Sequence, residues 1–205
     1  MSYDRLTPDN AAVLFVDHQT GLSNGIQDQS VPEYMAAVTA LAKIAKNFKL
    51  PSVITASTPD GPNGPTLPVI TELLPNAPVV PRPGEINAWD NRDFVAAVKK
   101  TGRKKLLIAG VSTEVCVAFV ALSAMKDGYD VYAVIDASGT WNKLVQEIAV
   151  ARMAHAGIKQ ITWVAVFAEL LADWRNPDAQ LHAETIGAHL PFYGNLMASF
   201  QAAKS

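Results

Sequence analysis

Short apolar runs recur along this chain and are separated by segments in which apolar and polar residues follow a helical period. A continuous apolar run of this length is typical of a strand that is covered on both faces of a sheet. We predict strands at residues 11–16, 52–56, 78–81, 106–111, 131–135 and 160–166. Prolines at both ends of the third run indicate an edge strand, because proline cannot donate to a central ladder.

Helices are predicted between these strands from apolar residues at helical spacing. Ser30 and Glu33 form a capping-box pattern at the start of the first helix, and Gly128 and Gly157 are expected to end two later ones. The predicted helices cover residues 31–48, 67–74, 92–100, 144–156 and a segment between the turn after residue 111 and Gly128.

The alternation of strands and helices predicts an α/β fold, a Rossmann-like three-layer sandwich with a mostly parallel six-stranded sheet and helices on both faces. We expect one domain over residues 1–205. The segment from about residue 168 onward reads as helical and irregular and is rich in large apolar side chains, so we expect it to mediate oligomerisation.

The segment KKLLIAGVSTEVCVAFVALSAMKDGY carries Cys116, the only cysteine, directly after a predicted strand. Ser112 and Thr113 are good N-cap residues, which places Cys116 in the first or second turn of a helix. Backbone N–H groups at a helix N-terminus lower the pKa of a thiol and can bind an oxyanion. The alternative is that Cys116 is an inert, buried apolar residue, as single cysteines often are.

Two further ionisable residues are expected at the carboxyl ends of strands. Asp17 follows the first strand and Arg82 follows the third. Each alone is also compatible with a structural role at a turn. Together with Cys116, they place an acid, a cation and a thiol where parallel α/β sheets bind their ligands, which favours a functional site.

Composition narrows the classes of partner. The chain has 205 residues, 49% of them hydrophobic and 18% charged, with a net charge of −2. This balance gives no reason to expect nucleic acid or a membrane surface as a partner, and it favours a small-molecule substrate. One cysteine excludes an intrachain disulfide, and the sequence has neither a signal-peptide core nor a long apolar run. We therefore expect a cytoplasmic protein.

VLFVDHQ, the basic residue after the third strand and AGVSTEVCV together resemble the isochorismatase-like cysteine hydrolases, and RPGEINAWDN, DASGTWN and DWRN look like the YcaC-type branch of that family. The resemblance implies that Cys116 is the nucleophile, that Asp17 is the general base and that Arg82 stands at the position of a catalytic lysine. It also implies a cis peptide bond between Val111 and Ser112, with the N–H groups of Ser112 and Cys116 as an oxyanion hole.

The chain departs from the family pattern in two respects. Arginine stays charged in proteins, so Arg82 cannot share a proton transfer and is expected to hold Asp17 ionised and oriented. The segment TASTPDGPNG lacks the D-x-H pair that binds metal in the family's nicotinamidases, and the four histidines lack ligand spacing. We expect neither a metal nor another cofactor.

Candidate substrate contacts are Thr58, Asn87 and Trp89, of which Trp89 is equally compatible with a core or oligomer contact.

The resemblance implies a hydrolase that cleaves a C–N bond of a small amide-like substrate through a thioester, and a homo-oligomer, specifically an octamer. One alternative is a non-catalytic binding or scaffold member of the same fold, which the Arg82 substitution motivates. A second alternative is a nucleotide-binding Rossmann domain. No G-x-G-x-x-G follows the first strand, where VDHQTGLSNG stands instead.

Overall fold

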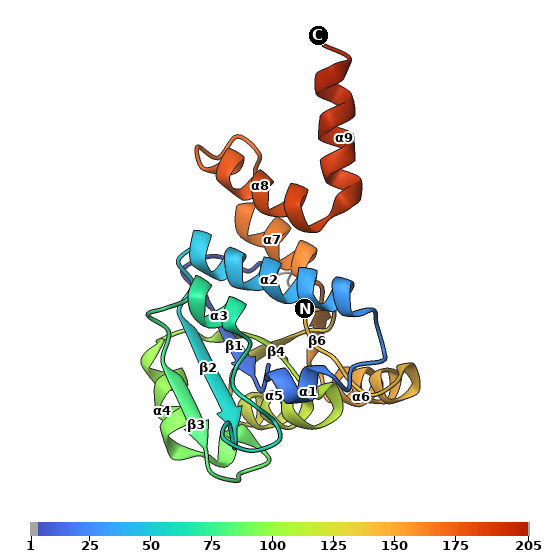
Figure 1. Cartoon of the computed structure of the whole chain (residues 1–205). Coiled ribbons are helices and arrows are strands. Elements are labelled where there is room, and N and C mark those ends of the chain that lie inside the picture. The colour runs from blue at the N-terminus through green and yellow to red at the C-terminus, as the bar shows by residue number, and fades with distance from the viewer. Residues whose placement is uncertain (1–3, 205) are drawn as a thin grey trace.

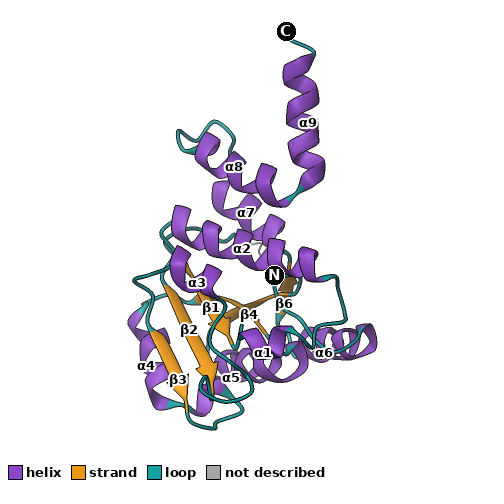
Figure 2. Cartoon of the chain, in the orientation of Figure 1, coloured by secondary structure: helices purple, strands orange, loops and turns teal. Residues whose placement is uncertain are grey.

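A single parallel sheet forms the centre of the protein, which is described here by a computed structural model covering residues 4–204 (Figure 1, Figure 2). Residues 1–3 and 205 of the predicted domain lie outside the described residues. The strands are β1 (Ala11–Val16), β2 (Ser52–Ser57), β3 (Val79–Arg82), β4 (Lys105–Gly110), β5 (Asp130–Val134) and β6 (Lys159–Ile161). Their order across the sheet is β3-β2-β1-β4-β5-β6, and every pair of neighbours is parallel.

Helices connect these strands and continue beyond the last one (Figure 1). They are α1 (Thr20–Ser23), α2 (Val31–Asn47), α3 (Pro68–Leu73), α4 (Arg92–Lys100), α5 (Ala118–Lys126), α6 (Lys143–His155), α7 (Trp163–Leu171), α8 (Ala179–His189) and α9 (Pro191–Ala202). A short 3₁₀ turn covers Ala88–Asp90, and a π-helical turn covers Thr113–Val117.

The two faces of the sheet pack into separate apolar cores, as the alternating side chains of β1 show. Val13 and Phe15 face the core shared with α2 and α7, whereas Leu14 and Val16 face the core shared with α4 and α5. All residues of β1 are buried, because helices cover the sheet on both sides. The predicted three-layer α/β architecture is therefore confirmed.

Several local predictions are also confirmed. The first strand has the predicted bounds, and Ser30 and Glu33 form both hydrogen bonds of a capping box at the start of α2. Gly128 and Gly157 are the second residues after α5 and α6 and adopt positive φ angles of 86° and 96°, a conformation that glycine reaches without steric cost. The proline-flanked strand β3 lies at the edge of the sheet.

The prediction of a strand over residues 160–166 is wrong in its second half. The strand β6 ends at Ile161, and α7 begins at Trp163. Thr162 caps this helix through the Ala165 N–H, and the Asp136 carboxylate accepts the Trp163 N–H at 3.0 Å. A short apolar run does not distinguish a buried strand from a buried helical turn, so polar capping groups decide the outcome here.

The C-terminal helices extend away from the sheet. Helix α8 packs on α2, with the His182 ring stacked on Phe48 at a centroid distance of 3.8 Å, whereas no residue of α9 is buried. Figure 1 shows α9 projecting beyond the body of the protein. Residues 168–171 complete α7, whose Leu170 and Leu171 are buried, so the projecting part of the predicted oligomerisation segment starts later than residue 168. None of the helices between residues 4 and 204 is long and apolar enough to cross a membrane.

Candidate active site

The predicted acid and thiol follow the two central strands at the point where the strand order reverses. The chain runs outward from β1 through β2 to β3, then returns to β4 on the other side of β1. Asp17 comes directly after β1, and Cys116 lies in the π-helical turn after β4. Because ligands of open α/β sheets bind at this reversal, the sequence-predicted site occupies the position that the topology favours.

Asp17 and Arg82 form an ion pair that is fully buried. The Nη2 atom of Arg82 donates to both carboxylate oxygens of Asp17, at 2.5 Å and 2.6 Å, and both side chains have no exposed surface. The Nη1 atom of Arg82 donates to the Glu85 carbonyl oxygen at 3.1 Å, and the Ser57 N–H donates to Oδ1 of Asp17 at 2.9 Å. Buried charges require such pairing, because either charge alone would be strongly destabilising.

Cys116 lies in a π-helical turn where the sequence predicted the first turns of an α-helix. The Val117 N–H reaches the Ser112 carbonyl oxygen at 3.1 Å, five residues back. The peptide bond between Val111 and Ser112 is cis, as the resemblance implies. The Asp17 carboxylate acts on the Cys116 thiol through its charge and as a hydrogen-bond acceptor, which favours the protonated thiol, whereas the Ser112 backbone favours the thiolate.

The acidity of the thiol differs from the sequence-based prediction. Burial raises the pKa of Cys116 well above its ordinary value, and the negative charge and hydrogen bond of Asp17 raise it further. These effects exceed the opposing influence of Ser112 and Arg82, so the expected lowered pKa is wrong. Burial also raises the pKa of Asp17, while the Arg82 guanidinium opposes that rise. The resting site therefore pairs a protonated thiol with the carboxylate that can take its proton.

Gly110, the last residue of β4, permits the close approach of the two central strands. A Cβ atom at this position would lie 2.1 Å from the Val16 carbonyl oxygen. The next residue, Val111, donates its N–H to the same oxygen at 3.1 Å. The absence of a side chain at Gly110 thus allows the turn that carries Cys116 to start beside Asp17.

The three candidate substrate contacts have different surroundings. Asn87 donates to Oγ of Ser123 at 3.0 Å, and the Trp89 indole N–H donates to Asp127 at 2.9 Å, so both side chains attach their loop to α5 and its end. Trp89 also packs on two aromatic rings, which favours its structural interpretation. Thr58 is exposed at a φ of 45°, and its N–H donates to the Arg82 carbonyl oxygen at 2.8 Å.

Two residues that contact the site were missed by sequence reasoning. Ser57 donates its backbone N–H to Asp17, and Gln19 accepts the same N–H through its side chain. No sequence pattern indicates these roles, because backbone donors are present at every position. Gln19 belongs to the VLFVDHQ motif, but the motif does not reveal which groups its side chain contacts.

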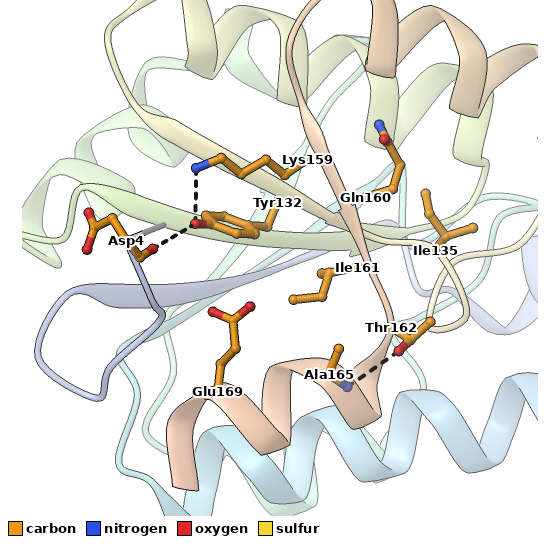
Figure 3. Close-up of a pocket in the computed structure, with 9 residues that line it drawn as sticks. All are labelled: Asp4, Tyr132, Ile135, Lys159, Gln160, Ile161, Thr162, Ala165 and Glu169. Carbon is orange, nitrogen blue, oxygen red and sulfur yellow. Dashed lines mark hydrogen bonds between the residues drawn. The ribbon is translucent and has the colours of Figure 1, made fainter. Parts of the chain in front are cut away.

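The described residues form hollows away from Asp17, Arg82 and Cys116, and they form no cluster of side chains that could hold a metal ion. Between residues 4 and 204, no group of three or more His, Cys, Asp or Glu side chains is arranged to hold a metal ion. A hollow of about 590 Å³ at the β6 edge is lined by Tyr132, Lys159 and Glu169 among others, and neither the acid, the cation nor the thiol of the site lines it (Figure 3).

The fold and the site together define a class of protein. It is a parallel α/β sheet that carries a thiol, a buried carboxylate and a cation at its carboxyl edge, where such sheets bind their ligands. The Isochorismatase domain model matches residues 11–165, which is most of the chain. The chain belongs to the isochorismatase family.

Two YcaC proteins match this chain along nearly the whole length of both chains. Probable hydrolase YcaC of Escherichia coli (strain K12) is 50% identical over 198 residues, covering 97% of this chain and 95% of the relative. YcaC from Pseudomonas aeruginosa, solved with hexane-2,5-diol and covalent acrylamide, is 53% identical with a TM-score of 0.96 and coverage of 98% and 99%. The solved E. coli protein, described as an octameric hydrolase of unknown specificity, has a TM-score of 0.96 at 50% identity and covers 99% of each chain. These relatives identify the chain as an isochorismatase-family hydrolase.

Proposed function

We propose that this hydrolase cleaves a C–N bond of a small amide-like substrate through a thioester on Cys116. The observation that carries the proposal is the pairing of the Cys116 thiol with a carboxylate, Asp17, that also forms a buried ion pair with Arg82. A thiol paired with a base that a third group orients is the arrangement of nucleophilic catalysis.

In the first half of the reaction, Asp17 takes the thiol proton as the Cys116 sulfur attacks the substrate carbonyl carbon. The N–H groups of Ser112 and Cys116 bind the oxyanion that forms. When the tetrahedral intermediate collapses, the C–N bond breaks and Asp17 gives its proton to the leaving nitrogen. An amine departs, and the acyl group remains on the sulfur as a thioester.

In the second half, Asp17 takes a proton from a water molecule, and the resulting hydroxide attacks the thioester carbonyl carbon. The C–S bond breaks, the sulfur regains a proton from Asp17, and a carboxylic acid is released. Arg82 remains charged throughout and stabilises the ionised form of Asp17. The net reaction consumes one amide and one water and needs neither a metal nor another cofactor.

A relative supports this proposal. The P. aeruginosa YcaC protein, 53% identical to this chain, is described with covalent acrylamide. Acrylamide is a small electrophilic amide, and its covalent attachment is the reactivity expected of a protein with an accessible nucleophile. The partner that we propose for the present chain is accordingly a small molecule rather than nucleic acid or a membrane.

Hydrolysis of a panel of small amides and ureides tests this function, with amine release as the readout. We expect turnover by the natural protein, loss of turnover in Cys116→Ala and Cys116→Ser, and an acyl adduct of the natural protein in intact-mass spectra. Undiminished turnover in Cys116→Ala would falsify the thioester mechanism. No turnover of any panel member, with a thiol that stays unacylated, would favour the alternative of a non-catalytic scaffold.

We further propose that the protein assembles as a homo-oligomer, specifically an octamer, through its C-terminal segment. Phe192, Leu196 and Phe200 are spaced one turn apart on α9 and are 71%, 50% and 53% exposed, a stripe that a second copy of the chain would cover. The solved E. coli YcaC protein is described as octameric. We also propose a cytoplasmic location, because a reducing compartment suits a single unpaired cysteine.

A further inference from the structure

Gln19, two residues after the proposed general base, is completely buried although its side chain is polar. It occupies the N-cap position of α1, yet its side chain forms no capping hydrogen bond. The side-chain amide instead bonds to the segment after β2. Its Oε1 accepts the Ser57 N–H at 2.9 Å, and its Nε2 donates to the carbonyl oxygens of Ser57 at 3.0 Å and Gly64 at 2.5 Å.

The Ser57 N–H is shared by two acceptors. It donates to Oδ1 of Asp17 at 2.9 Å and to Oε1 of Gln19 at the same distance. Ser57 is thus a donor that helps to fix the Asp17 carboxylate, and its own position is fixed by two bonds to Gln19. A chain of contacts consequently runs from Gln19 through the Ser57 backbone to Asp17 and then to the Cys116 thiol.

Gln19 also joins both ends of the loop that follows β2, residues 58–65. The Gly64 carbonyl oxygen at the far end of this loop accepts the second proton of Nε2. Neighbouring backbone groups reinforce the attachment, since Thr20 N–H donates to the Pro65 carbonyl at 2.9 Å and Gly21 N–H to the Asn63 carbonyl at 2.8 Å. The start of the loop is strained, because Thr58 is β-branched and has a φ of 45°.

We propose that Gln19 is a positioning residue, which holds the Ser57 N–H against the Asp17 carboxylate and keeps the loop of residues 58–65 beside it. Both donors of Nε2 and the acceptor Oε1 are engaged in this task, and buried amide groups that lose such partners carry a desolvation cost. Its effect on hydrolysis rests on the proposed function, whereas its effect on the Asp17 and Cys116 pair does not.

The test measures iodoacetamide alkylation of Cys116 against pH by intact mass, which requires no turnover. Substituting Gln19→Met should release Ser57 and let water approach Asp17, which lowers the alkylation midpoint by about half a pH unit or more. The same substitution in an Asp17→Asn background should leave the midpoint unchanged, because the influence passes through Asp17. The proposal is overturned if Gln19→Met lowers the alkylation midpoint equally in both backgrounds, because a general loosening of the structure around Cys116 would have that effect. It is also overturned if the midpoint shifts in neither background.

A matched control is Gln29→Met. Gln29 also bridges two backbone carbonyl oxygens, those of Asp136 at 3.3 Å and Ser138 at 2.6 Å, and its side-chain hydrogen bonds involve neither Asp17 nor Ser57. We expect no midpoint shift in this control.

A second variant, Gln19→Glu, keeps the oxygen that accepts from Ser57 and adds a carboxylate beside Asp17, so it should raise the midpoint. If Gln19→Met does not fold, this variant decides the question, and an unchanged or lowered midpoint overturns the proposal. Hydrolysis that is lost only on substitution of Cys116, with no midpoint shift in either Gln19 variant, would leave the proposed function intact and remove the role of Gln19.

Discussion

One nitrogen of Arg82, Nη2, lies within 2.6 Å of both carboxylate oxygens of Asp17, so a single atom carries the ion pair. The other terminal nitrogen is engaged by the Glu85 carbonyl oxygen. Arg82 therefore acts on Asp17 through one contact point, as a lysine ammonium group would, and uses its second arm to anchor the backbone after β3.

Removing the Arg82 cation should destabilise the folded protein. Substituting Arg82→Met leaves the buried Asp17 carboxylate without its partner, and we expect the free energy of unfolding to fall by about 3 to 5 kcal/mol. Arg82→Lys keeps the positive charge and should lower the free energy of unfolding by less. Urea denaturation measures the free energy of unfolding of both variants. The matched control is Arg175→Met, which breaks an exposed pair with Asp173 and should change stability by less than about 0.5 kcal/mol. Equal losses at Arg82 and Arg175 would contradict the role of burial.

Neutralising Asp17 should have opposite effects on thiol acidity and on turnover. The charge and hydrogen bond of Asp17 raise the pKa of Cys116, so Asp17→Asn should move the midpoint of iodoacetamide alkylation to lower pH. The same variant lacks the proposed general base, and its hydrolysis rate should fall by roughly 10²- to 10⁴-fold. Alkylation followed by intact mass is unambiguous, because the chain has one cysteine. An unchanged midpoint would show that Asp17 does not set the acidity of the thiol.

The close approach at Gly110 predicts a severe effect of one methyl group. Substituting Gly110→Ala places a Cβ atom 2.1 Å from the Val16 carbonyl oxygen and forces β1 and β4 apart. We expect a loss of stability of about 3 kcal/mol or more in urea denaturation, at the upper end of overpacking effects. Gly84→Ala is the control, because among the described residues, its two chain neighbours apart, no atom lies within 4 Å of its added Cβ. A tolerated Gly110→Ala would show that the two strands can separate without cost.

The buried His18 and the half-buried Asp136 make opposite contributions to the pH dependence of stability. Burial lowers the pKa of His18 to about 4, so its contribution to stability is lost as the pH falls below 6.5, where the unfolded chain takes up a proton. Burial raises the pKa of Asp136 to about 6, so its contribution is gained as the pH falls toward 3.8.

Replacing Asp136 should therefore increase the net loss of stability at low pH, because the loss caused by His18 is then no longer offset. Asp136→Asn keeps an oxygen that can accept the Trp163 N–H but no longer titrates. Between pH 7 and pH 5, the variant should lose about 1 kcal/mol more stability than the natural protein. Urea denaturation at the two pH values provides the comparison, and equal losses in both proteins would contradict the assignment to Asp136.

The apolar stripe of α9 predicts how the assembly can be disrupted. The double substitution Phe192→Ser and Phe200→Ser should lower the particle mass in light scattering, because it removes apolar surface that a second copy would bury. The control Ile86→Ser alters an apolar side chain that is 67% exposed on a different part of the protein. A monomeric mass of the natural protein, or an unchanged mass of the double variant, would refute the assignment of the interface to α9.

The sequence was sufficient to predict the sheet. It was also sufficient to predict that Asp17, Arg82 and Cys116 lie at the carboxyl ends of strands. Buried parallel strands leave a strong signal, since every residue of β1 is apolar, and the positions of Asp17, Arg82 and Cys116 follow from where their strands end. The error at residues 160–166 arose because Trp163 and Val166 are buried equally well by a strand or by a helix.

Properties that depend on the three-dimensional surroundings of a residue could not be predicted from the sequence. The predicted lowering of the thiol pKa considered only the turn that carries Cys116, whereas burial and the charge of Asp17 outweigh it. Gln19 was missed for a similar reason, because its partners Ser57 and Gly64 lie about forty positions away in the chain and contribute only backbone groups.

The raised pKa of Cys116 also determines how the protein tolerates oxidants. Peroxides and adventitious electrophiles react with thiolates rather than with thiols, and sulfinic or sulfonic acids formed on a nucleophile inactivate it permanently. Burial and Asp17 raise the pKa of Cys116, which keeps the sulfur protonated at rest. In the proposed mechanism it gives up this proton to Asp17 only when a carbonyl is in place, so it would be exposed to this damage only briefly during each catalytic cycle. In the proposed mechanism, the carboxylate that activates Cys116 would thus also protect it between turnovers.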